Sequence, residues 1–257
     1  MPLDLTLVIP CYRESSHIER SFPDLMAALH RCRLDWEVVF IDDGSPDDTV
    51  AKLTQLVATE PRARLVVNEK NLGRGGTVMK GIRASTAKCV GFIDIDLSTP
   101  PLYVPHLAAL ICEDRVDVAT CQRSYKIEIR VVHKVWLRYI LSYGYRTLGR
   151  AVLGHSLADT ETGCKFFNRE KILPVLDRIR DPRWFWDTEV MIYSWLAGLR
   201  IVEDASIFIR RPEKPSTVKV AHDVAEYLRN LAAFRRKVRP EILAMRARER
   251  ELQESPC

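Results

Sequence analysis

Short apolar runs rich in β-branched residues alternate with amphipathic stretches through the first hundred residues of the chain. Four runs predict strands, at 5–10, 36–42, 63–68 and 89–96. Their near-continuous apolar character is typical of strands that are buried on both faces of a parallel sheet. Helical periodicity lies between them, at about 15–31, 47–59 and 75–86. Strands that alternate with helices predict an α/β fold with a mostly parallel central sheet and right-handed crossovers.

The second half of the chain is less regular. It predicts a strand at 116–120, a helix at about 131–152, a turn at 158–167, a helix at about 187–198, a strand at 201–209 and a terminal helix from near 222. There is no internal repeat, low-complexity tract or clear linker. We therefore expect one α/β domain over residues 1–212 and a helical C-terminal extension over 213–257.

Composition narrows the class of protein without defining its function. The chain is 47% hydrophobic and carries a net charge of +5, which suits acidic ligands or an anionic membrane surface. Its seven cysteines are scattered without a CxxC pair, which favours reduced thiols over a disulfide framework. No apolar run reaches membrane-spanning length, and the first residues lack the pattern of a signal peptide. We expect a cytoplasmic protein that is soluble or bound at a membrane surface.

Polar clusters lie at or just after the predicted carboxyl ends of the first four strands. They are Pro10–Glu14, Asp42–Ser45, Asn68–Gly76 and Asp94–Ser98. Open parallel sheets bind ligands beyond these strand ends, so the four clusters predict a single site at one edge of the sheet.

Two aspartates, Asp94 and Asp96, interrupt the apolar run of the fourth strand in "GFIDIDLSTPP". Alternate side chains of a strand point to the same face, so the two carboxylates lie close together and repel each other unless a cation compensates. Carboxylate oxygens are the ligands that Mg²⁺ and Mn²⁺ prefer, and substrate phosphates commonly complete the shell. The alternative is a pair of solvated aspartates in a loop.

A glycine-rich segment, "NEKNLGRGGTVMKG", follows the third strand. Its glycines allow close backbone approach to a ligand at a helix start, which makes Asn68, Gly73 and Gly76 candidate contacts. The segment is neither a Walker loop nor a GxGxxG motif after a first strand. Asp42 and Asp43 could accept hydrogen bonds from a base or ribose, or they could simply cap a turn.

Five segments together resemble a known family. "VIPCYRE", "IDDGSPDDT", "NLGRGGTVMKG", "DIDLST" and "DTETGCKFF" are similar, in this order, to the motifs of family 2 glycosyltransferases with the GT-A fold. Among these the chain most resembles polyprenyl-phosphate glycosyltransferases, such as dolichyl-phosphate glucose and mannose synthases, over roughly residues 4–212. The resemblance implies an inverting transfer of sugar from a nucleotide sugar, of the UDP-glucose or GDP-mannose type, to a polyprenyl phosphate.

On the donor side, the resemblance implies roles for residues at the first, second and fourth strand ends. The nucleotide pocket would be lined by Pro10, Tyr12, Glu14 and Asp42. Asp94 and Asp96 would flank the Mg²⁺ or Mn²⁺ ion that binds the donor diphosphate.

On the acceptor side, the resemblance implies that Arg123 and Lys165 face the acceptor phosphate. Asp187 and Glu189, in "WFWDTEV", are lesser candidates. A phosphate acceptor is already largely anionic at neutral pH and needs cations more than a base. A hydroxyl acceptor would instead need a general base, for which Asp159 is the best-placed residue.

Two other functions remain open from the sequence. The same donor chemistry could serve a soluble acceptor or a glycan hydroxyl, or the chain could bind a nucleotide sugar without transferring it. The paired aspartates argue against the binding protein. A pyrophosphorylase would be expected to carry a glycine-rich loop directly after the first strand, where this chain has "PCYRES".

Membrane contact is expected from a basic and aromatic segment. Its basic residues are Lys134, Arg138, Arg146 and Arg150, which are interleaved with aromatic residues. Such a helix suits the cytosolic membrane face, and an apolar stripe over 224–234 with flanking arginines is a second candidate. Both helices could instead pack on the sheet or on a partner subunit. We expect no nucleic-acid partner, and either a homo-oligomer or a membrane-embedded partner is compatible with the pattern.

Overall fold

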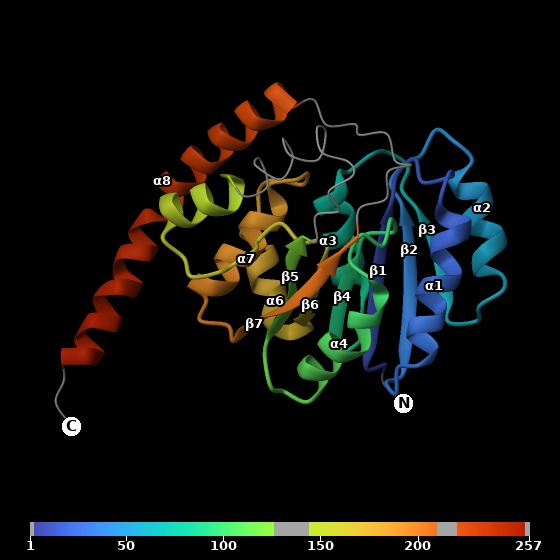
Figure 1. The fold of residues 1–257 in the computed structure, drawn as a ribbon, viewed down its shortest axis with the longest axis horizontal. Coiled ribbons are helices and arrows are strands. Elements are labelled where there is room, and N and C mark those ends of the chain that lie inside the picture. Colours follow the sequence, from blue (N-terminus) through green and yellow to red (C-terminus); the bar gives the residue numbers. More distant parts are fainter. Residues whose placement is uncertain (1–2, 126–143, 210–219, 255–257) are drawn as a thin grey trace.

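The computed structural model describes residues 3–125, 144–209 and 220–254, and its centre is one seven-stranded sheet (Figure 1). The strands are β1 (Leu5–Cys11), β2 (Trp36–Asp42), β3 (Ala63–Val67), β4 (Cys89–Ile93), β5 (Val118–Tyr125), β6 (Cys164–Asn168) and β7 (Ile201–Phe208). Their order across the sheet is β3-β2-β1-β4-β6-β5-β7. Within this sheet β6 is antiparallel to both neighbours, and every other pairing is parallel. The predicted α/β fold with a mostly parallel sheet is confirmed.

Helices cover both faces of the sheet. They are α1 (Ile18–His30), α2 (Thr49–Val57), α3 (Arg74–Ala84), α4 (Val104–Cys112), α6 (Arg169–Leu176), α7 (Trp186–Leu196) and α8 (Val220–Glu254), with a 3₁₀ turn at Pro101–Tyr103 and a further helical segment at 144–153. Buried side chains of α1, α2 and α4 join one hydrophobic core, and those of α3, α6, α7 and α8 join the other. The sheet is therefore the middle layer of three.

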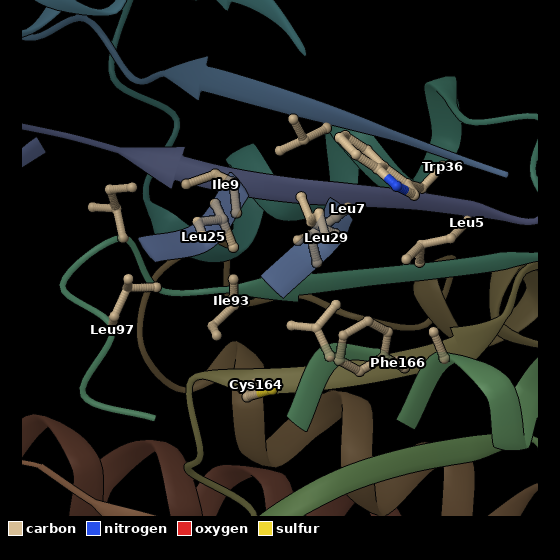
Figure 2. Packing of buried hydrophobic residues seen from close by; sticks show 14 of the residues in the cluster. Leu5, Leu7, Ile9, Leu25, Leu29, Trp36, Ile93, Leu97, Cys164 and Phe166 are labelled. Carbon is tan, nitrogen blue, oxygen red and sulfur yellow. The ribbon is translucent and has the colours of Figure 1, made fainter. Parts of the chain in front are cut away.

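Side-chain alternation along β1 explains why it is mostly apolar. Leu5, Leu7 and Ile9 lie in the core shared with α1, whose Leu25 and Leu29 are close by in Figure 2. Val8, between them, lies in the opposite core, and all these side chains are fully buried. Burying each leucine stabilises the fold by about 1.5–3 kcal/mol. The polar residue inside β1, Thr6, is buried and donates a hydrogen bond to Glu37 at 2.8 Å, and the functional candidates of this strand lie near its carboxyl end.

The prediction that residues 63–68 are buried on both faces is wrong. This segment forms the edge strand β3, which pairs only with β2, and Val67 is 48% exposed. An edge strand lacks a neighbour on one side, so water reaches side chains that a central strand would cover.

The elements α4, β6 and α6 were not predicted. The segment 158–167 was expected to be a turn, but its last four residues enter β6, which pairs with β4 on one side and β5 on the other. A five-residue strand directly followed by a helix carries too little periodicity to stand out from a loop.

The terminal helix α8 packs on the core through part of its apolar stripe. Leu231 and Phe234 are buried, and the Phe234 ring lies 5.2 Å from the ring of Tyr193 in α7. These two residues pack against α7 and its flanking loop, which themselves lie on the sheet, while Leu228 is 44% exposed. The later turns of α8 extend away from the sheet (Figure 1).

Only part of the expected basic helix over 131–152 lies within the described residues. Lys134 and Arg138 fall outside them, and Arg150 is exposed on the segment 144–153. The expectation that Arg146 faces a membrane is wrong for this structure, because its side chain is 10% exposed and lies 3.9 Å from Asp159. Among the helices in the described ranges, none is both long and apolar enough to cross a bilayer.

Candidate active site

The polar clusters that follow four neighbouring strands, β3, β2, β1 and β4, meet at the carboxyl ends of these strands. The Asp43 N–H donates to the Cys11 carbonyl at 2.8 Å, and the Asn68 N–H donates to the Asp42 carbonyl at 2.8 Å. Arg74, in the glycine-rich segment, reaches Asp94 after β4 at 2.9 Å. All four predicted clusters are thus linked along one edge of the sheet, as the sequence indicated.

Asp42 offers a buried carboxylate oxygen without a partner. Its Oδ2 accepts hydrogen bonds from the N–H groups of Gly44 and Ser45 at 3.0 and 2.9 Å, and Gly44 takes the positive φ of 73° that this turn needs. Its Oδ1 is buried and has no hydrogen-bond partner among the described residues. A buried acceptor without a donor is costly, so this atom suits a ligand N–H or O–H, as in a base or a ribose.

Asp43 and Asn68, both predicted nucleotide contacts, hold the glycine-rich segment instead. The Asp43 carboxylate accepts hydrogen bonds from Asn68 Nδ2 at 3.0 Å, from the Leu72 N–H at 2.8 Å and from the Gly73 N–H at 2.9 Å. Asn68 Oδ1 in turn accepts a hydrogen bond from Lys80 at 2.6 Å. With these oxygens occupied, both residues shape the loop in this structure.

The glycines fit a close backbone contact, but the contact is internal. Gly73 has a φ of 82°, and a Cβ at this position would lie 2.6 Å from the Pro182 carbonyl oxygen. The Gly76 N–H donates to that same oxygen at 2.8 Å. The Gly76 N–H is therefore bonded within the protein in this structure, and its contact with a ligand stays a prediction. Gly73 and Gly76 bring the start of α3 against the loop before α7.

That loop is held by Glu189, one of the lesser candidates. Glu189 Oε2 accepts hydrogen bonds from the N–H groups of Arg180 and Asp181, both at 2.8 Å. The Glu189 carboxylate therefore stabilises the backbone of this loop. The neighbouring Trp184 is 68% exposed, so the loop presents a large aromatic surface next to the site.

The three candidates at the carboxyl end of β1 differ in their exposure and contacts. Tyr12 is 41% exposed, and the guanidinium of Arg13 lies 5.3 Å from its ring centroid. Glu14 is 7% exposed, and its carboxylate forms an ion pair with His17 at the start of α1. Pro10 lies within β1, where it pairs with Ile41. Tyr12 is thus the most accessible of the three candidates.

Asp94 and Asp96 follow β4 directly. Asp94 Oδ1 accepts a hydrogen bond from Arg74 Nε, while 36% of the side chain stays exposed. Asp96 Oδ1 accepts one from the Ser98 N–H at 3.0 Å. A Cβ on Gly163 would lie 2.0 Å from Asp94 Oδ2, so the backbone before β6 can approach Asp94 only because this residue is glycine. Desolvation raises the pKa of Asp94, and the charge of Asp96 raises it further, against the opposing effect of Arg74.

This carboxylate pair fits a hard divalent cation that has further ligands from elsewhere. Burial is the main cause of the raised pKa of Asp94 and the charge of Asp96 adds to it, and a cation bound beside both carboxylates would oppose both effects. In the part of the chain that the structure describes, no group of three acidic, histidine or cysteine side chains could hold a metal by itself. Mg²⁺ or Mn²⁺ held by two carboxylates takes its remaining oxygens from water or from substrate phosphates.

Lys165 is fully buried, which contradicts the expectation that it faces an acceptor phosphate. Its Nζ donates to the Thr162 carbonyl and to Asp187 Oδ1, both at 2.5 Å, and lies 5.4 Å from the centroid of the Phe92 ring. Lys165 pairs with Phe92 across β6 and β4, and its side chain lies against α7. The lysine therefore compensates the charge of Asp187, and its burial keeps it from direct contact with a ligand in this structure.

Arg123 and Asp159 form a two-bond ion pair. Arg123 Nε and one terminal nitrogen donate to the two carboxylate oxygens at 2.7 and 2.8 Å, and Asp159 is fully buried. Burial alone would raise the pKa of Asp159, but the charge and hydrogen bonds of Arg123 outweigh it and lower the pKa. A carboxylate with a lowered pKa is a weak proton acceptor, so this environment disfavours Asp159 as a general base.

The sequence did not single out Glu161 and Arg74 as functional candidates. Glu161 accepts a hydrogen bond from the Thr188 hydroxyl, and burial together with the charge of Asp187 raises its pKa to about 7. Arg74 joins Asp94 to Asp187. The sequence pattern could have indicated Arg74, because an arginine between two glycines at the start of a helix has room to reach the end of a neighbouring strand.

Replacing Glu161 with glutamine should make stability less sensitive to pH. The folded pKa of about 7 lies above the usual value of about 4.3, so the native state holds the extra proton between these pH values. Stability of the wild type should therefore fall as pH rises through this window. Thermal melts from pH 4.5 to pH 8 should show the Glu161→Gln variant gaining on the wild type. A constant difference in Tm across this range would contradict the raised pKa.

The chain is similar in sequence to several known proteins. A model described as Glycosyl transferase family 2 matches residues 6–173. The chain is 30% identical over 203 residues to Glycosyltransferase AglD of Haloferax volcanii, covering 78% of this chain and 32% of that protein. It is 27% identical over 218 residues to a Dolichyl-phosphate beta-glucosyltransferase of Dictyostelium discoideum, covering 79% of this chain and 67% of that protein. The chain thus spans about a third of the first relative and about two thirds of the second.

A solved structure shares the architecture. Glucosyl-3-phosphoglycerate synthase from Mycobacterium tuberculosis, in complex with Mn²⁺, uridine-diphosphate and glucosyl-3-phosphoglycerate, superposes with a TM-score of 0.63. The sequence identity is 19%, and the match covers 90% of this chain and 78% of that chain. At this identity the likeness establishes a common fold.

Proposed function

Because the chain belongs to glycosyl transferase family 2 and has the GT-A fold, we propose that it transfers a sugar from a nucleotide sugar to the phosphate of a polyprenyl phosphate. The transfer inverts the configuration of the sugar and depends on Mg²⁺ or Mn²⁺. The dolichyl-phosphate beta-glucosyltransferases among its relatives support this acceptor class. They also favour a donor of the UDP-glucose type over one of the GDP-mannose type.

One observation carries the proposal. A buried carboxylate oxygen that lacks a hydrogen-bond donor and a pair of carboxylates that suits a metal ion lie at the same edge of the sheet. The unpartnered Oδ1 of Asp42 suits the base or ribose of a nucleotide. Asp94 and Asp96 would hold the divalent cation beside its diphosphate. Tyr12 offers an exposed ring directly after Cys11, whose carbonyl accepts the Asp43 N–H. A divalent cation bound at Asp94 and Asp96 would neutralise the negative charge that develops on the leaving nucleoside diphosphate. A nucleotide diphosphate-sugar uses all of these groups at once.

The environment of Asp159 favours a phosphate acceptor. A phosphate monoester is mostly doubly ionised at pH 7 and attacks without losing a proton to the enzyme. The one aspartate expected to serve as a base for a hydroxyl is instead paired with Arg123 and has a lowered pKa. Arg123 remains the acceptor-side cation of the proposal, with 14% of its side chain exposed.

A hydroxyl acceptor is the second candidate, and Glu161 is the observation that favours it. A carboxyl group with a pKa of about 7 is well matched to accept a proton at neutral pH. Under this alternative Glu161 would be the base, and the acceptor would be a soluble compound or a growing glycan.

An assay with defined acceptors separates the two functions. The protein is incubated with a panel of nucleotide sugars, Mn²⁺ and polyprenyl phosphate, and the lipid is analysed by mass spectrometry. We expect one hexose to be added to the lipid phosphate. Arg123→Ala should lower the rate by at least about a hundredfold, because it removes a charge-assisted contact in a partly buried site. Glu161→Gln should leave the rate within about threefold, because a phosphate needs no general base.

The matched control is Arg115→Ala, which removes an exposed arginine near the opposite end of β5. It should behave as the wild type. Loss of activity in Glu161→Gln together with near-normal activity in Arg123→Ala would contradict the phosphate acceptor and support the hydroxyl. Absence of any sugar transfer from every nucleotide sugar, with nucleotide still bound, would support a binding protein.

We propose a peripheral location at the cytosolic membrane face, where a polyprenyl phosphate presents its head group. Lys134 and Arg138, outside the described residues, and the exposed Arg150 are the basic residues that this proposal assigns to the surface contact. Each such residue near an anionic leaflet contributes about 1 kcal/mol. A homo-oligomer or a membrane-embedded partner would strengthen this contact.

A further inference from the structure

Arg74 lies between a predicted metal ligand and the buried charges behind it. Its Nε donates to Asp94 Oδ1 at 2.9 Å, and a terminal nitrogen donates to Asp187 Oδ2. The guanidinium lies near two aromatic rings, with centroid distances of 5.1 Å to Phe92 and 5.5 Å to Trp184. Its side chain is 12% exposed, so it is held in place and still borders the site.

The backbone fixes this position. Arg74 is the first residue of α3, and a Cβ on the next residue, Gly75, would lie 2.5 Å from the Trp186 side chain. The helix start therefore sits directly against α7, which carries Asp187. Asp187 is in turn held by Lys165 on its other oxygen. Two cations and two carboxylates alternate in a row, Lys165–Asp187–Arg74–Asp94, so each carboxylate of this row has a cationic partner without any added ion.

A divalent cation at Asp94 would disturb this pairing. It would approach a carboxylate that already has a guanidinium on Oδ1, and two cations on one carboxylate repel each other. A diphosphate changes the situation, because its oxygens offer the planar guanidinium a new partner of high negative charge. Arg74 can then leave Asp94 without losing its compensation.

We propose that Arg74 is a placeholder cation, which occupies Asp94 in the free protein and moves to the nucleotide diphosphate when the donor binds. Asp94 is then open to the divalent cation only in the presence of the nucleotide, so metal and donor bind as a unit. This inference rests on the proposed donor and metal site. The inference assigns Arg74 a positioning role, because this residue makes metal binding at Asp94 depend on bound nucleotide. By linkage, each ligand raises the affinity for the other by the same factor.

Binding of Mn²⁺ with and without nucleotide tests the proposal. Free Mn²⁺ is measured by electron paramagnetic resonance during titration of the wild type, Arg74→Gln and Arg83→Gln, alone and with UDP or GDP. Without nucleotide, Arg74→Gln should bind Mn²⁺ at least about fivefold more tightly than the wild type, the low end of typical couplings between sites. The increase in Mn²⁺ affinity caused by nucleotide should also be smaller in this variant. Arg83→Gln is the matched control, because Arg83 lies on the same helix and pairs with the exposed Asp177.

Arg74→Lys separates charge from packing. It keeps a cation at the position, so its Mn²⁺ affinity without nucleotide should stay as low as that of the wild type. Thermal melts establish that each variant is folded, and Arg74→Met, which retains contact with the Phe92 ring, replaces the glutamine variant if that one unfolds. Equal or weaker Mn²⁺ binding by Arg74→Gln without nucleotide would overturn the placeholder role, as would a lysine variant that binds as tightly as the glutamine variant. Failure of UDP and GDP to bind the wild type would instead contradict the proposed donor.

Discussion

Replacing Asp96 with asparagine is expected to abolish sugar transfer while leaving the fold intact. The change removes one of the two carboxylates that would hold the divalent cation, and it also removes a charge that repels Asp94. The loss of a carboxylate ligand should cost about 4 kcal/mol of transition-state stabilisation, or roughly a thousandfold in rate. Initial rates with a nucleotide sugar and polyprenyl phosphate, together with thermal melts, measure both effects.

Asp48→Asn provides the control for this prediction. Asp48 is an exposed aspartate at the same sheet edge, just before α2, and its carboxylate has no place in the proposed metal site. Its variant should retain the wild-type rate. Full activity of the Asp96→Asn variant in the presence of a chelator would show that neither the carboxylate nor a metal ion is needed.

Replacing Asp187 with alanine is expected to have the largest effect on stability. Asp187 is buried and accepts hydrogen bonds from both Lys165 and Arg74. Its loss therefore leaves the Lys165 ammonium fully buried, with the Thr162 carbonyl as the hydrogen-bond acceptor that it retains. Removing one partner of a buried ion pair typically costs 3–5 kcal/mol, because the other charge stays uncompensated. Urea denaturation at pH 7 should show a decrease of about this size in the free energy of unfolding.

The control for this second prediction is Asp177→Ala, which breaks the exposed ion pair with Arg83. Its effect should be within about 0.5 kcal/mol, since solvent screens such pairs. A loss below about 1 kcal/mol for Asp187→Ala would mean that the buried row of charges contributes little beyond what hydrophobic contacts provide.

The convergence of the polar residues on the proposed donor side could be predicted from the sequence, because it depends on chain direction. In a parallel sheet the residue after each strand lies at the same edge, so Asp42, Asn68 and Asp94 had to converge once their strands were identified. The individual roles were harder to predict. Asp42 keeps an unpartnered oxygen while its neighbour Asp43 is bonded to the loop, and this difference arises from tertiary contacts that no local pattern records.

The acceptor side was predicted less well, because its geometry depends on β6. Lys165 was expected at the surface of a turn, but it lies in a strand between β4 and β5, where its side chain is enclosed. Its partner Asp187 comes from α7, and Arg123 meets Asp159 across a similar gap in the chain. Pairs of this kind are defined by the packing of separate elements, so residue type and spacing alone could not reveal them.

The reversed strand β6 also determines the order in which the molecule can assemble. The strands β1 to β4 are joined by short βαβ connections, so the groups around Asp42 and Asp43 can form as that part of the chain leaves the ribosome. The strand β4 gains its second neighbour only when β6 has been synthesised, because Cys89 pairs with Asn168. Closing the long loop between these two residues is slow. Until then Asp94 lacks Gly163 beside it. We therefore expect the nascent protein to pass through a stage in which the strand ends around Asp42 and Asp43 are formed and the surroundings of Asp94 are incomplete.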